Sequence, residues 1–343
     1  MRRADIARLQ TDSLPIRNHG GSPVRLLRTA FDYLVYLMVR ALILIVQAIP
    51  LSLLTALTGG LARLFADVLR VRRRVAEENL ALAFPGTSPE VIADTIRRMW
   101  EHLFLMVCEI AHSSRVIHET NWRRFIRLNG VRPLVKLLLE DRPVILVTGH
   151  FGNFEIGGYL LGMLGFPTHT VARTLDNRFL DRFLNRFRGA TGQFIIPKNG
   201  GHRQIEETVE RGGTLALLAD QDAGRKGCFV PFFGRPASTF KALALLSLEY
   251  DAPLAVVYVK RLDRPMTFEM GVQAILDPRN LADHSPRAAV EHITRWYTSE
   301  LEAIVRSAPE QYWWIHRRWK TQPKVGRESA GRPAADCPEH RAA

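Results

Sequence analysis

Two hydrophobic periodicities alternate along the chain between residues 96 and 307. Short runs rich in Val, Ile and Leu are typical of buried strands, and longer segments with apolar residues every three or four positions are typical of amphipathic helices. We expect strands at 144–148, 168–172, 193–196, 214–219, 254–260 and 266–275, and helices at 96–113, 132–140, 153–164, 177–189, 202–211, 239–250 and 287–307. This alternation predicts an α/β fold with a largely parallel central sheet flanked by helices.

A strongly apolar segment precedes this region. Residues 41–62 contain no charged side chain, and this length approaches that of a membrane span, but Pro50 and the Gly59–Gly60 pair interrupt it. Basic residues flank both sides, whereas a simple span usually has a one-sided excess. The pattern favours a segment that enters one leaflet or a helix pair broken at Pro50. A single crossing and a buried helix pair of a soluble protein are the alternatives.

These changes in pattern divide the chain into four parts. We expect a disordered basic tail over 1–22, apolar membrane-associating helices over 23–70, a folded domain over 71–320, and a second disordered tail over 321–343. The last part is rich in Arg, Pro, Ala and Gly. The catalytic or binding residues are therefore expected within 71–320.

Composition narrows the class of partner. The chain has 343 residues, 47% of them hydrophobic, and a formal net charge of +13, which favours anionic partners such as nucleic acid, an anionic membrane, or an acidic carrier or substrate. Cys108, Cys228 and Cys337 are scattered and odd in number. They suggest a reducing compartment, and they form no zinc ligand set.

Polar residues follow three of the expected strands. His150 comes after the strand at 144–148, Arg173 after the strand at 168–172, and Asp220 and Asp222 after the strand at 214–219. Functional residues of parallel sheets gather at the carboxyl ends of the strands. If these strands are neighbours, the four side chains share one crevice.

His150 and Glu155 flank the beginning of an expected helix. A hydrogen bond between them would fix one ring nitrogen as a donor and leave the other free to accept a proton. This is part of a serine-hydrolase triad, but the chain contains no G-x-S-x-G motif, and no sequence context supports Thr148 or Cys228 as a covalent nucleophile. The nucleophile is then a hydroxyl of the substrate.

Gly152 and Asn153 lie between this histidine and the helix. Their backbone N–H groups would sit at a helix N-terminus, where they are suited to a developing oxyanion. The plainer interpretation is a capped helix with a histidine in the core.

Five blocks of sequence, in order, carry a resemblance to a known family. They are "RRRVAEENLALAFP", "TGHFGNFE", "ARTLDNRFLDRFLNRFRG", "LLADQDAGRKGCFVPFFGRPAST" and "PEQYWWIHRRWK". "HFGNFE" looks like the H-x4-(D/E) motif of the glycerolipid acyltransferase superfamily. Over about residues 25–320 the chain resembles the bacterial lipid A biosynthesis lauroyl/myristoyl acyltransferases.

This resemblance implies an enzyme at the cytoplasmic face of the bacterial inner membrane. It would transfer a fatty acyl chain from acyl carrier protein or coenzyme A to a hydroxyl of a glycolipid, most simply a lipid A precursor, with no metal or cofactor. By the motif match His150 is the general base and Glu155 its partner. Other acceptors, such as a mannolipid, a lysophospholipid or an aminolipid, stay open, as does a catalytically silent lipid-binding protein. No recognised nucleic-acid motif is present.

Three further residues are candidates for substrate binding. Arg173 suits a phosphate or headgroup, with a surface ion pair to Asp176 or Asp181 as the alternative. Asp220 and Asp222 flank Gln221 and would point the same way on an extended segment. There they would order the basic groups or hold sugar hydroxyls, and two carboxylates alone are weak evidence for a metal.

Two aromatic blocks have open interpretations. The loop containing Phe229, Phe232 and Phe233 either lines an acyl channel or packs in the core. The segment 312–320 combines aromatic residues with the basic cluster Arg317-Arg318-Lys320. It fits a nucleic-acid-binding surface, a membrane interface, a closing helix, or a surface that steers an anionic donor. His316 in this segment is expected to be structural.

Overall fold

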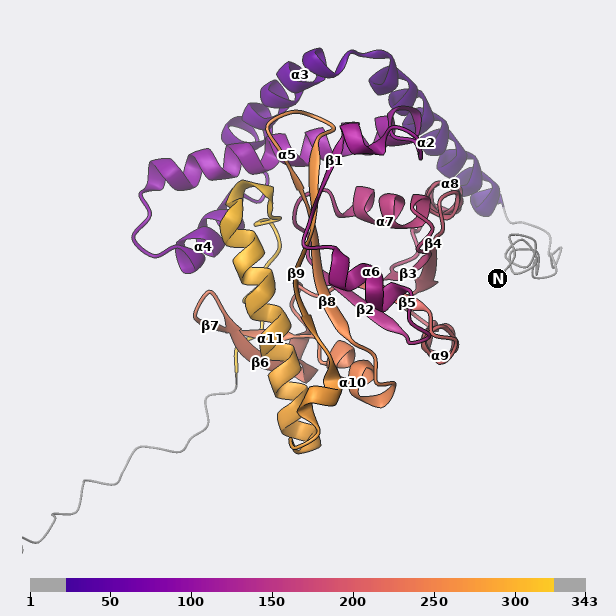
Figure 1. Ribbon diagram of the computed structural model, residues 1–343. Helices are drawn as coiled ribbons and strands as arrows, with labels where there is room; N and C mark the ends of the chain where they lie inside the picture. The colour runs from indigo at the N-terminus through magenta and orange to yellow at the C-terminus, as the bar shows by residue number, and fades with distance from the viewer. Residues whose placement is uncertain (1–22, 324–343) are drawn as a thin grey trace, which may run out of the picture.

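A seven-stranded mixed sheet forms the centre of the computed structural model, which describes residues 23–323 (Figure 1). The strand order is β1-β9-β8-β2-β5-β3-β4, and every neighbouring pair is parallel except β8 with β9. The strands are β1 (Ile126–Asn129), β2 (Val144–Thr148), β3 (Thr168–Ala172), β4 (Gln193–Pro197), β5 (Thr214–Leu218), β8 (Leu254–Arg261) and β9 (Phe268–Leu276). The expected α/β fold with a largely parallel sheet is confirmed.

Helices cover both faces of this sheet and extend beyond one end of it (Figure 1). The α-helices are α2 (Pro23–Ala48), α3 (Leu51–Arg63), α4 (Arg73–Ala83), α5 (Pro89–Val116), α6 (Arg132–Leu138), α7 (Phe154–Met163), α8 (Arg178–Gly189), α9 (His202–Glu210), α10 (Ala242–Glu249) and α11 (Pro286–Ser307). Polar N-caps begin several of them. Ser88 caps α5, Asn153 caps α7 and Asn177 caps α8.

Alternate residues of the central strands enter different cores. Ile145 and Val147 of β2 pack with residues of α10 and α11, whereas Val144 and Leu146 pack with residues of α7. Because successive strand residues point to opposite faces, a strand buried on both sides needs a continuous apolar run. The sequence VILVT of β2 meets this requirement, and it holds the carboxyl end of β2 in a rigid place.

The aromatic segment that begins at residue 228 was expected to be a loop, but it forms a β-hairpin. β6 (Cys228–Phe232) and β7 (Arg235–Thr239) pair in antiparallel fashion beside α11. Phe232 and Phe233 are buried in the core that also contains Trp314, whereas Phe229 is half-buried. Of the two interpretations offered by the sequence, the structure therefore supports core packing.

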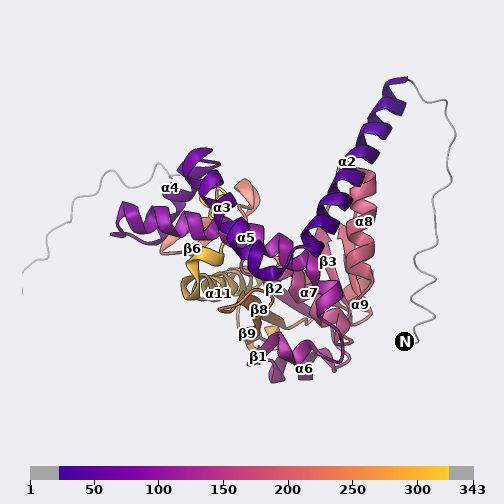
Figure 2. The ribbon, with the colours of Figure 1, turned by 90° about the horizontal axis from the view of Figure 1, so that it is seen from above.

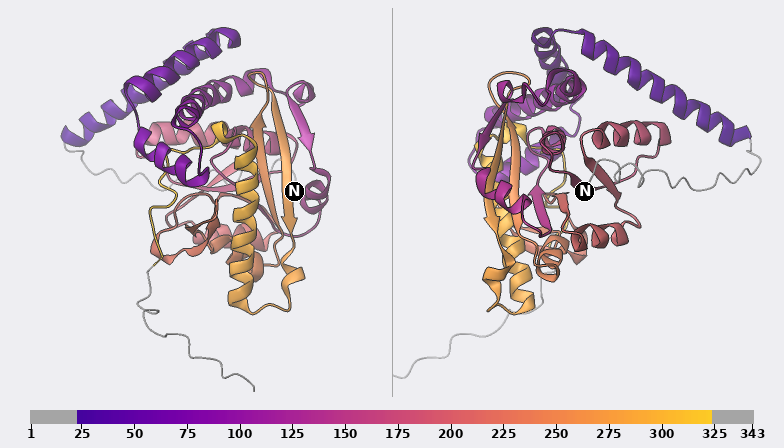
Figure 3. Two further views of the ribbon diagram at one scale, coloured as in Figure 1. Left: turned by 90° about the vertical axis from the view of Figure 1, so that its left-hand side faces the viewer. Right: turned by 45° about the vertical axis from the view of Figure 1, so that its right-hand side comes forward.

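The apolar N-terminal segment forms two helices that separate at Pro50. α3 packs along α5 and buries Leu54, Thr58 and Ala62. α2 extends away from the body and contacts α8 and α5, as the views from above and from the sides show (Figures 2 and 3). By length and composition α2 and the stretch Leu51–Val68 are both apolar enough to cross a membrane. The exposure of α2 excludes the alternative of a buried pair.

The two expected tails lie mostly outside the described residues. These are all of 1–22 and all but the first three positions of 321–343.

Candidate active site

The candidate residues converge because β2, β5 and β3 are neighbours in the sheet. Their carboxyl ends open onto a mostly apolar cavity of about 590 Å³. Its polar lining includes His150, Glu155, Arg173, Arg188 and Gln221, and α7 and α10 supply much of its apolar wall. The expectation of one shared crevice is confirmed for His150 and Arg173, with Asp220 directly behind His150.

The cavity passes through an opening between β3 and β5. These strands pair only at His169 with Leu215 and at Thr170 with Ala216, although both continue further. Beyond that point Val171 and Ala172 of β3 and Leu217 and Leu218 of β5 all line the cavity. The separation of the strands therefore admits a ligand to both faces of the sheet.

His150 is held by Asp220. Its Nδ1 lies 2.8 Å from Asp220 Oδ1, and its backbone N–H donates to Oδ2 at 2.7 Å. The ring packs against Phe154 and Trp313, with centroid separations of 5.4 Å and 4.9 Å. The second ring nitrogen, Nε2, is 3.4 Å from the amide nitrogen of Gln221, which also lines the cavity. One nitrogen is thus fixed by a carboxylate, and the other is directed at the ligand space.

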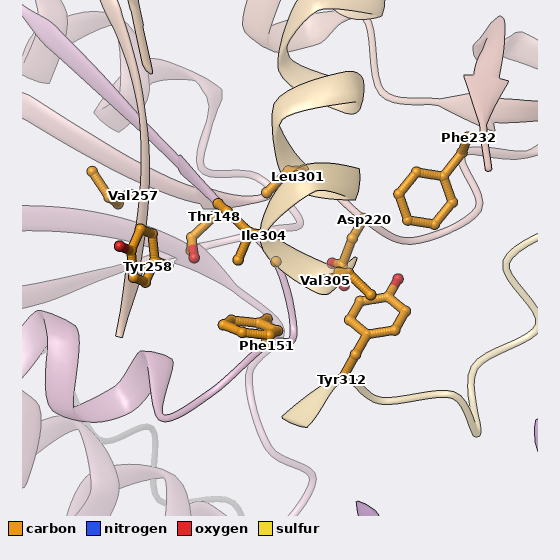
Figure 4. Close-up of a pocket in the computed structure, with 11 residues that line it drawn as sticks. Thr148, Phe151, Asp220, Phe232, Val257, Tyr258, Leu301, Ile304, Val305 and Tyr312 are labelled. Atoms are coloured by element: carbon orange, nitrogen blue, oxygen red, sulfur yellow. The ribbon is translucent and has the colours of Figure 1, made fainter. Parts of the chain in front are cut away.

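The charges of this pair stabilise each other. Burial alone would lower the pKa of His150, but the nearby Asp220 carboxylate more than offsets it and raises that pKa above its ordinary value. Burial alone would raise the pKa of Asp220, but His150 holds it below its ordinary value. Tyr312, whose hydroxyl lies beside Asp220 around a small void of about 10 Å³, is kept un-ionised because burial and Asp220 raise its pKa (Figure 4). Asp220 is therefore an anion ready to stabilise an imidazolium.

The sequence predicted a hydrogen bond between His150 and Glu155, and the structure corrects this prediction. Glu155 forms a two-point ion pair with Arg188, including a 3.0 Å bond to its Nε. α7 begins at Phe154, so Glu155 lies in its first turn and points toward the end of α8 instead of back toward the histidine. Both members of the ion pair line the cavity.

The backbone N–H groups of Gly152 and Asn153 are not free for an oxyanion. Gly152 donates to Gln311 O at 2.9 Å, and Asn153 donates to Val259 O at 2.8 Å. Gly152 has a φ of +58°, and a Cβ there would lie 1.9 Å from Val259 O. The absence of a side chain at Gly152 lets two backbone segments pass close to each other. The prediction that Gly152 and Asn153 bind an oxyanion through their backbone N–H groups is therefore wrong.

A buried polar network behind this loop was not predicted from the sequence. Arg261 binds Glu109 at two points, 2.7 Å each, and Glu109 also accepts from the Asn153 amide at 3.0 Å. Burial, together with Arg261, lowers the pKa of His102 well below its usual value. Neutral His102 therefore accepts from Arg261 and donates from Nε2 to Gly152 O, 3.2 Å away. α5 and β8 thereby fix the turn that carries His150.

The C-terminal aromatic block clamps the same turn. The backbone N–H of Trp313 donates to the backbone oxygen of His150 at 3.1 Å, and Phe151 and Tyr312 form an isolated antiparallel bridge. Sequence reasoning assigned this block to a membrane interface, a closing helix or a docking surface. Its position next to the "HFGNFE" turn could be found only from the folded chain.

The remaining candidates lie further from His150. Arg173 is exposed at the cavity rim and pairs with Asp176, as one sequence interpretation expected. Asp222 does not point with Asp220, because its carboxylate accepts hydrogen bonds from Gly224 and from both the backbone and the hydroxyl of Thr321. His316 accepts from the Asp222 N–H at 3.2 Å, which is a structural contact.

Arg317, Arg318 and Lys320 do not form one basic surface. Arg318 is 2% exposed, and its guanidinium donates to Ser238 O and to Thr239 Oγ1 at 2.6 Å each. The side chain secures the β6–β7 hairpin. The expectation that these three residues together steer an anionic donor is therefore wrong for Arg318.

Comparison with known proteins adds the family to this geometry. Residues 24–321 match the family described as bacterial lipid A biosynthesis acyltransferase. The chain is 30% identical over 282 residues to the lipid A biosynthesis palmitoleoyltransferase of Escherichia coli K12, covering 79% of this chain and 85% of that protein. It is 26% identical over 294 residues to the lauroyltransferase of the same organism, covering 85% and 93%. The chain belongs to the bacterial lipid A biosynthesis acyltransferase family.

Proposed function

We propose that this acyltransferase moves a fatty acyl chain from a thioester to a hydroxyl of a lipid A precursor, at the cytoplasmic face of the inner membrane. The observation that carries the proposal is the His150–Asp220 pair opening onto a mostly apolar cavity of about 590 Å³. This volume lies within the usual range for ligand pockets. The acceptor class is supported by the names of the relatives, which are lipid A acyltransferases.

His150 acts as the general base in this proposal. Nδ1–H donates to Asp220, and Nε2 takes the proton of the acceptor hydroxyl as its oxygen attacks the thioester carbonyl. The tetrahedral intermediate then collapses, the C–S bond breaks, and the imidazolium returns the proton to the leaving thiolate. One ester and one free thiol result, and no acyl-enzyme forms. Donor and acceptor must therefore be bound at the same time.

The Gln221 amide is our candidate donor to the oxyanion. Its nitrogen lies 3.4 Å from His150 Nε2, so it is close to where the reacting carbonyl must sit. The backbone of Gly152 and Asn153 is already used elsewhere. A side-chain donor next to the base replaces the helix N-terminus in this role.

The substrate-binding roles fall to the polar rim of the cavity. Glu155 holds Arg188 in the cavity wall, and Arg173 stands at the rim, where both guanidiniums are suited to a phosphate of the glycolipid. Asp220 orients His150 and does not contact substrate in this account. Asp222 supports the loop that carries Gln221. The donor is an anionic thioester of acyl carrier protein or coenzyme A, which the net charge of +13 favours.

Membrane association is proposed from the apolar surface of α2. Several of its large side chains, among them Leu27, Phe31, Leu34 and Leu42, are more than half exposed, and no residue of its apolar window is buried. A surface of this kind in water marks an interaction site. The lipid acceptor resides in the membrane that would cover it.

Mass spectrometry of membrane glycolipids from cells with and without the gene tests this function. We expect loss of the gene to remove one acyl chain from lipid A species and to leave a precursor one acyl mass lighter. An unchanged lipid A profile together with a missing acyl chain on a mannolipid, a lysophospholipid or an aminolipid would move the acceptor to that class. No change in any lipid would refute the proposal.

A further inference from the structure

α8 carries a ridge of arginines that the proposed chemistry does not use. Arg178, Arg182 and Arg186 are spaced by four residues, so they lie on one side of the helix, and all three are exposed. The ion pairs on and around α8 involve Arg173, Arg188 and Arg203 instead. Among the residues that the structure describes, the three ridge arginines have no acidic partner. They are an unneutralised basic stripe on the protein surface.

The face of α8 next to this ridge, about 100° around the helix, packs against α2. Phe179 meets Tyr33 edge to face at 5.2 Å, and Phe183 lies 6.2 Å from Tyr36. The Asn177 amide donates to Asp32 O at 2.7 Å, which ties the beginning of α8 to α2. The two helices lie side by side in the views of Figures 2 and 3. The basic ridge is therefore continuous with the exposed apolar surface of α2.

The position of this contact decides how α2 can meet a bilayer. α8 is attached to the middle of α2, between Asp32 and Arg40, where the helix also presents two tyrosines. If α2 crossed the membrane, its middle would lie at the depth of the hydrocarbon centre, and the arginines of α8 would lie there too. Arginine is costly at that depth, whereas Tyr and Arg are typical of the headgroup region. An orientation in the plane of the surface satisfies both helices.

We propose that α2 and α8 form one interfacial platform, in which α2 lies in the plane of the membrane surface and Arg178, Arg182 and Arg186 bind the phosphates of anionic phospholipids. The proposal rests on the membrane association argued above and adds its surface, its lipid and its orientation. Arg173 and Arg188, just before α8 and near its end, line the cavity. The platform thus presents the cavity to the lipid layer from which the acceptor comes.

Vesicle flotation of the full-length protein tests the arginine ridge. The wild type is compared with Arg178→Gln/Arg182→Gln/Arg186→Gln on vesicles of phosphatidylcholine alone and of phosphatidylcholine containing phosphatidylglycerol. We expect the wild type to prefer the anionic vesicle and the triple variant to lose roughly ten- to a hundredfold of that preference at low salt. Arg211→Gln/Arg235→Gln/Arg287→Gln is the matched control, because it removes the same charge from exposed positions away from α2 and α8. It should keep the preference.

Three results would overturn this assignment. One is a wild type indifferent to phosphatidylglycerol, and another is an equal loss in the control variant. The third is an unchanged vesicle preference with a raised Michaelis constant for the thioester donor in neutral micelles, which would make the ridge a docking surface for an acidic carrier. Acyl transfer in neutral micelles, which we expect the ridge variant to retain, separates this test from the function itself. A wild type inactive there would count against the function and not against the ridge.

Spin labels test the orientation of α2. Leu27, Leu34 and Ile45 are exposed and lie on nearly the same side of the helix, so each is replaced by a labelled cysteine in a background lacking Cys108, Cys228 and Cys337. An in-plane helix gives three similar depths in phosphatidylglycerol-containing vesicles. A label at Leu34 that lies much deeper than the other two would show a crossing helix and overturn the platform.

Discussion

At the scale of single residues, the proposed mechanism makes the pairing of His150 with Asp220 set the pH range in which the enzyme is active. The base must be neutral to accept a proton, and Asp220 raises the pKa at which it becomes neutral despite the opposing effect of burial. In the proposed mechanism the same carboxylate stabilises the imidazolium that forms when His150 takes the proton. Loss of Asp220 therefore affects both the rate and its dependence on pH.

We expect Asp220→Asn to lower turnover by roughly 10²–10⁴-fold while the protein stays folded. In the wild type, activity should fall as pH drops through the raised pKa of His150. Without the carboxylate, burial dominates and lowers that pKa, so the acidic limb of the kcat/KM profile should move to lower pH. The measurement is a pH series of kcat/KM for both proteins. An acidic limb that stays in place would mean that Asp220 does not govern the base.

Glu155 should act through Arg188 and not through His150. A double-mutant cycle of Glu155→Gln and Arg188→Gln, read as kcat/KM, is expected to give a coupling of roughly 1–3 kcal/mol, with the double variant scarcely worse than the more damaged single variant. The acidic limb should move less in Glu155→Gln than in Asp220→Asn. Independent, multiplying effects would place Glu155 in a separate role and restore its direct link to the histidine.

At the scale of elements, the turn between β2 and α7 is fixed by its crossing with β8. We expect Gly152→Ala to destabilise the protein and abolish activity, because a Cβ would collide with Val259 O in addition to the strain of a positive φ. Gly165 has a φ of +93°, and no atom lies within 4 Å of its Cβ position. Gly165→Ala therefore measures the backbone strain alone, which should lower the free energy of unfolding by about 1–2 kcal/mol. Thermal unfolding of both variants measures the difference. Equal losses would show that the crossing with β8 adds nothing.

Elements were predictable where the local pattern is unambiguous. β2 and β3 have the expected bounds, because a continuous apolar or β-branched run has few alternatives. The β6–β7 hairpin was missed, because Pro231, Gly234 and Pro236 are typical of turns and their place in an edge hairpin depends on packing against α11.

The partner of His150 could not be read from the sequence. Asp220 is 70 positions away, and it meets His150 only because β2 and β5 are adjacent in the sheet, which local periodicity does not determine. Glu155 was the natural candidate at a spacing of five residues, but the direction of the first turn of α7 turns it toward Arg188. Arg318 likewise belongs to a basic run in sequence and to a buried hydrogen-bond network in the fold.

At the scale of the whole molecule, the two N-terminal helices have different tasks. α3 contributes buried residues to its packing on α5, whereas no residue of the apolar window of α2 is buried. The expected unit of residues 23–70 therefore divides into an exposed helix and a helix that belongs to the folded body.

Two truncations separate these tasks. A protein that begins at Pro50 should keep its thermal unfolding transition but bind vesicles less well than a protein that begins at Pro23, since of the helices it lacks only α2. A protein that begins at Phe65 should unfold at a markedly lower temperature, because Leu54, Thr58 and Ala62 no longer cover α5. Vesicle flotation and circular dichroism give the two readouts. Equal stability of the two proteins would contradict the division, as would undiminished vesicle binding by the first.

The most direct test of the central claim is acyl transfer by the purified protein, followed at once by thiol release and by the mass of the lipid. With an acyl thioester and a lipid A precursor, the account predicts one thiol released for each acyl mass gained by the precursor. It also predicts no thiol release without the acceptor, and a loss of roughly 10²-fold or more in His150→Ala that retains the wild-type circular dichroism spectrum. Undiminished turnover by folded His150→Ala, or acyl-enzyme formed in the absence of acceptor, would contradict it.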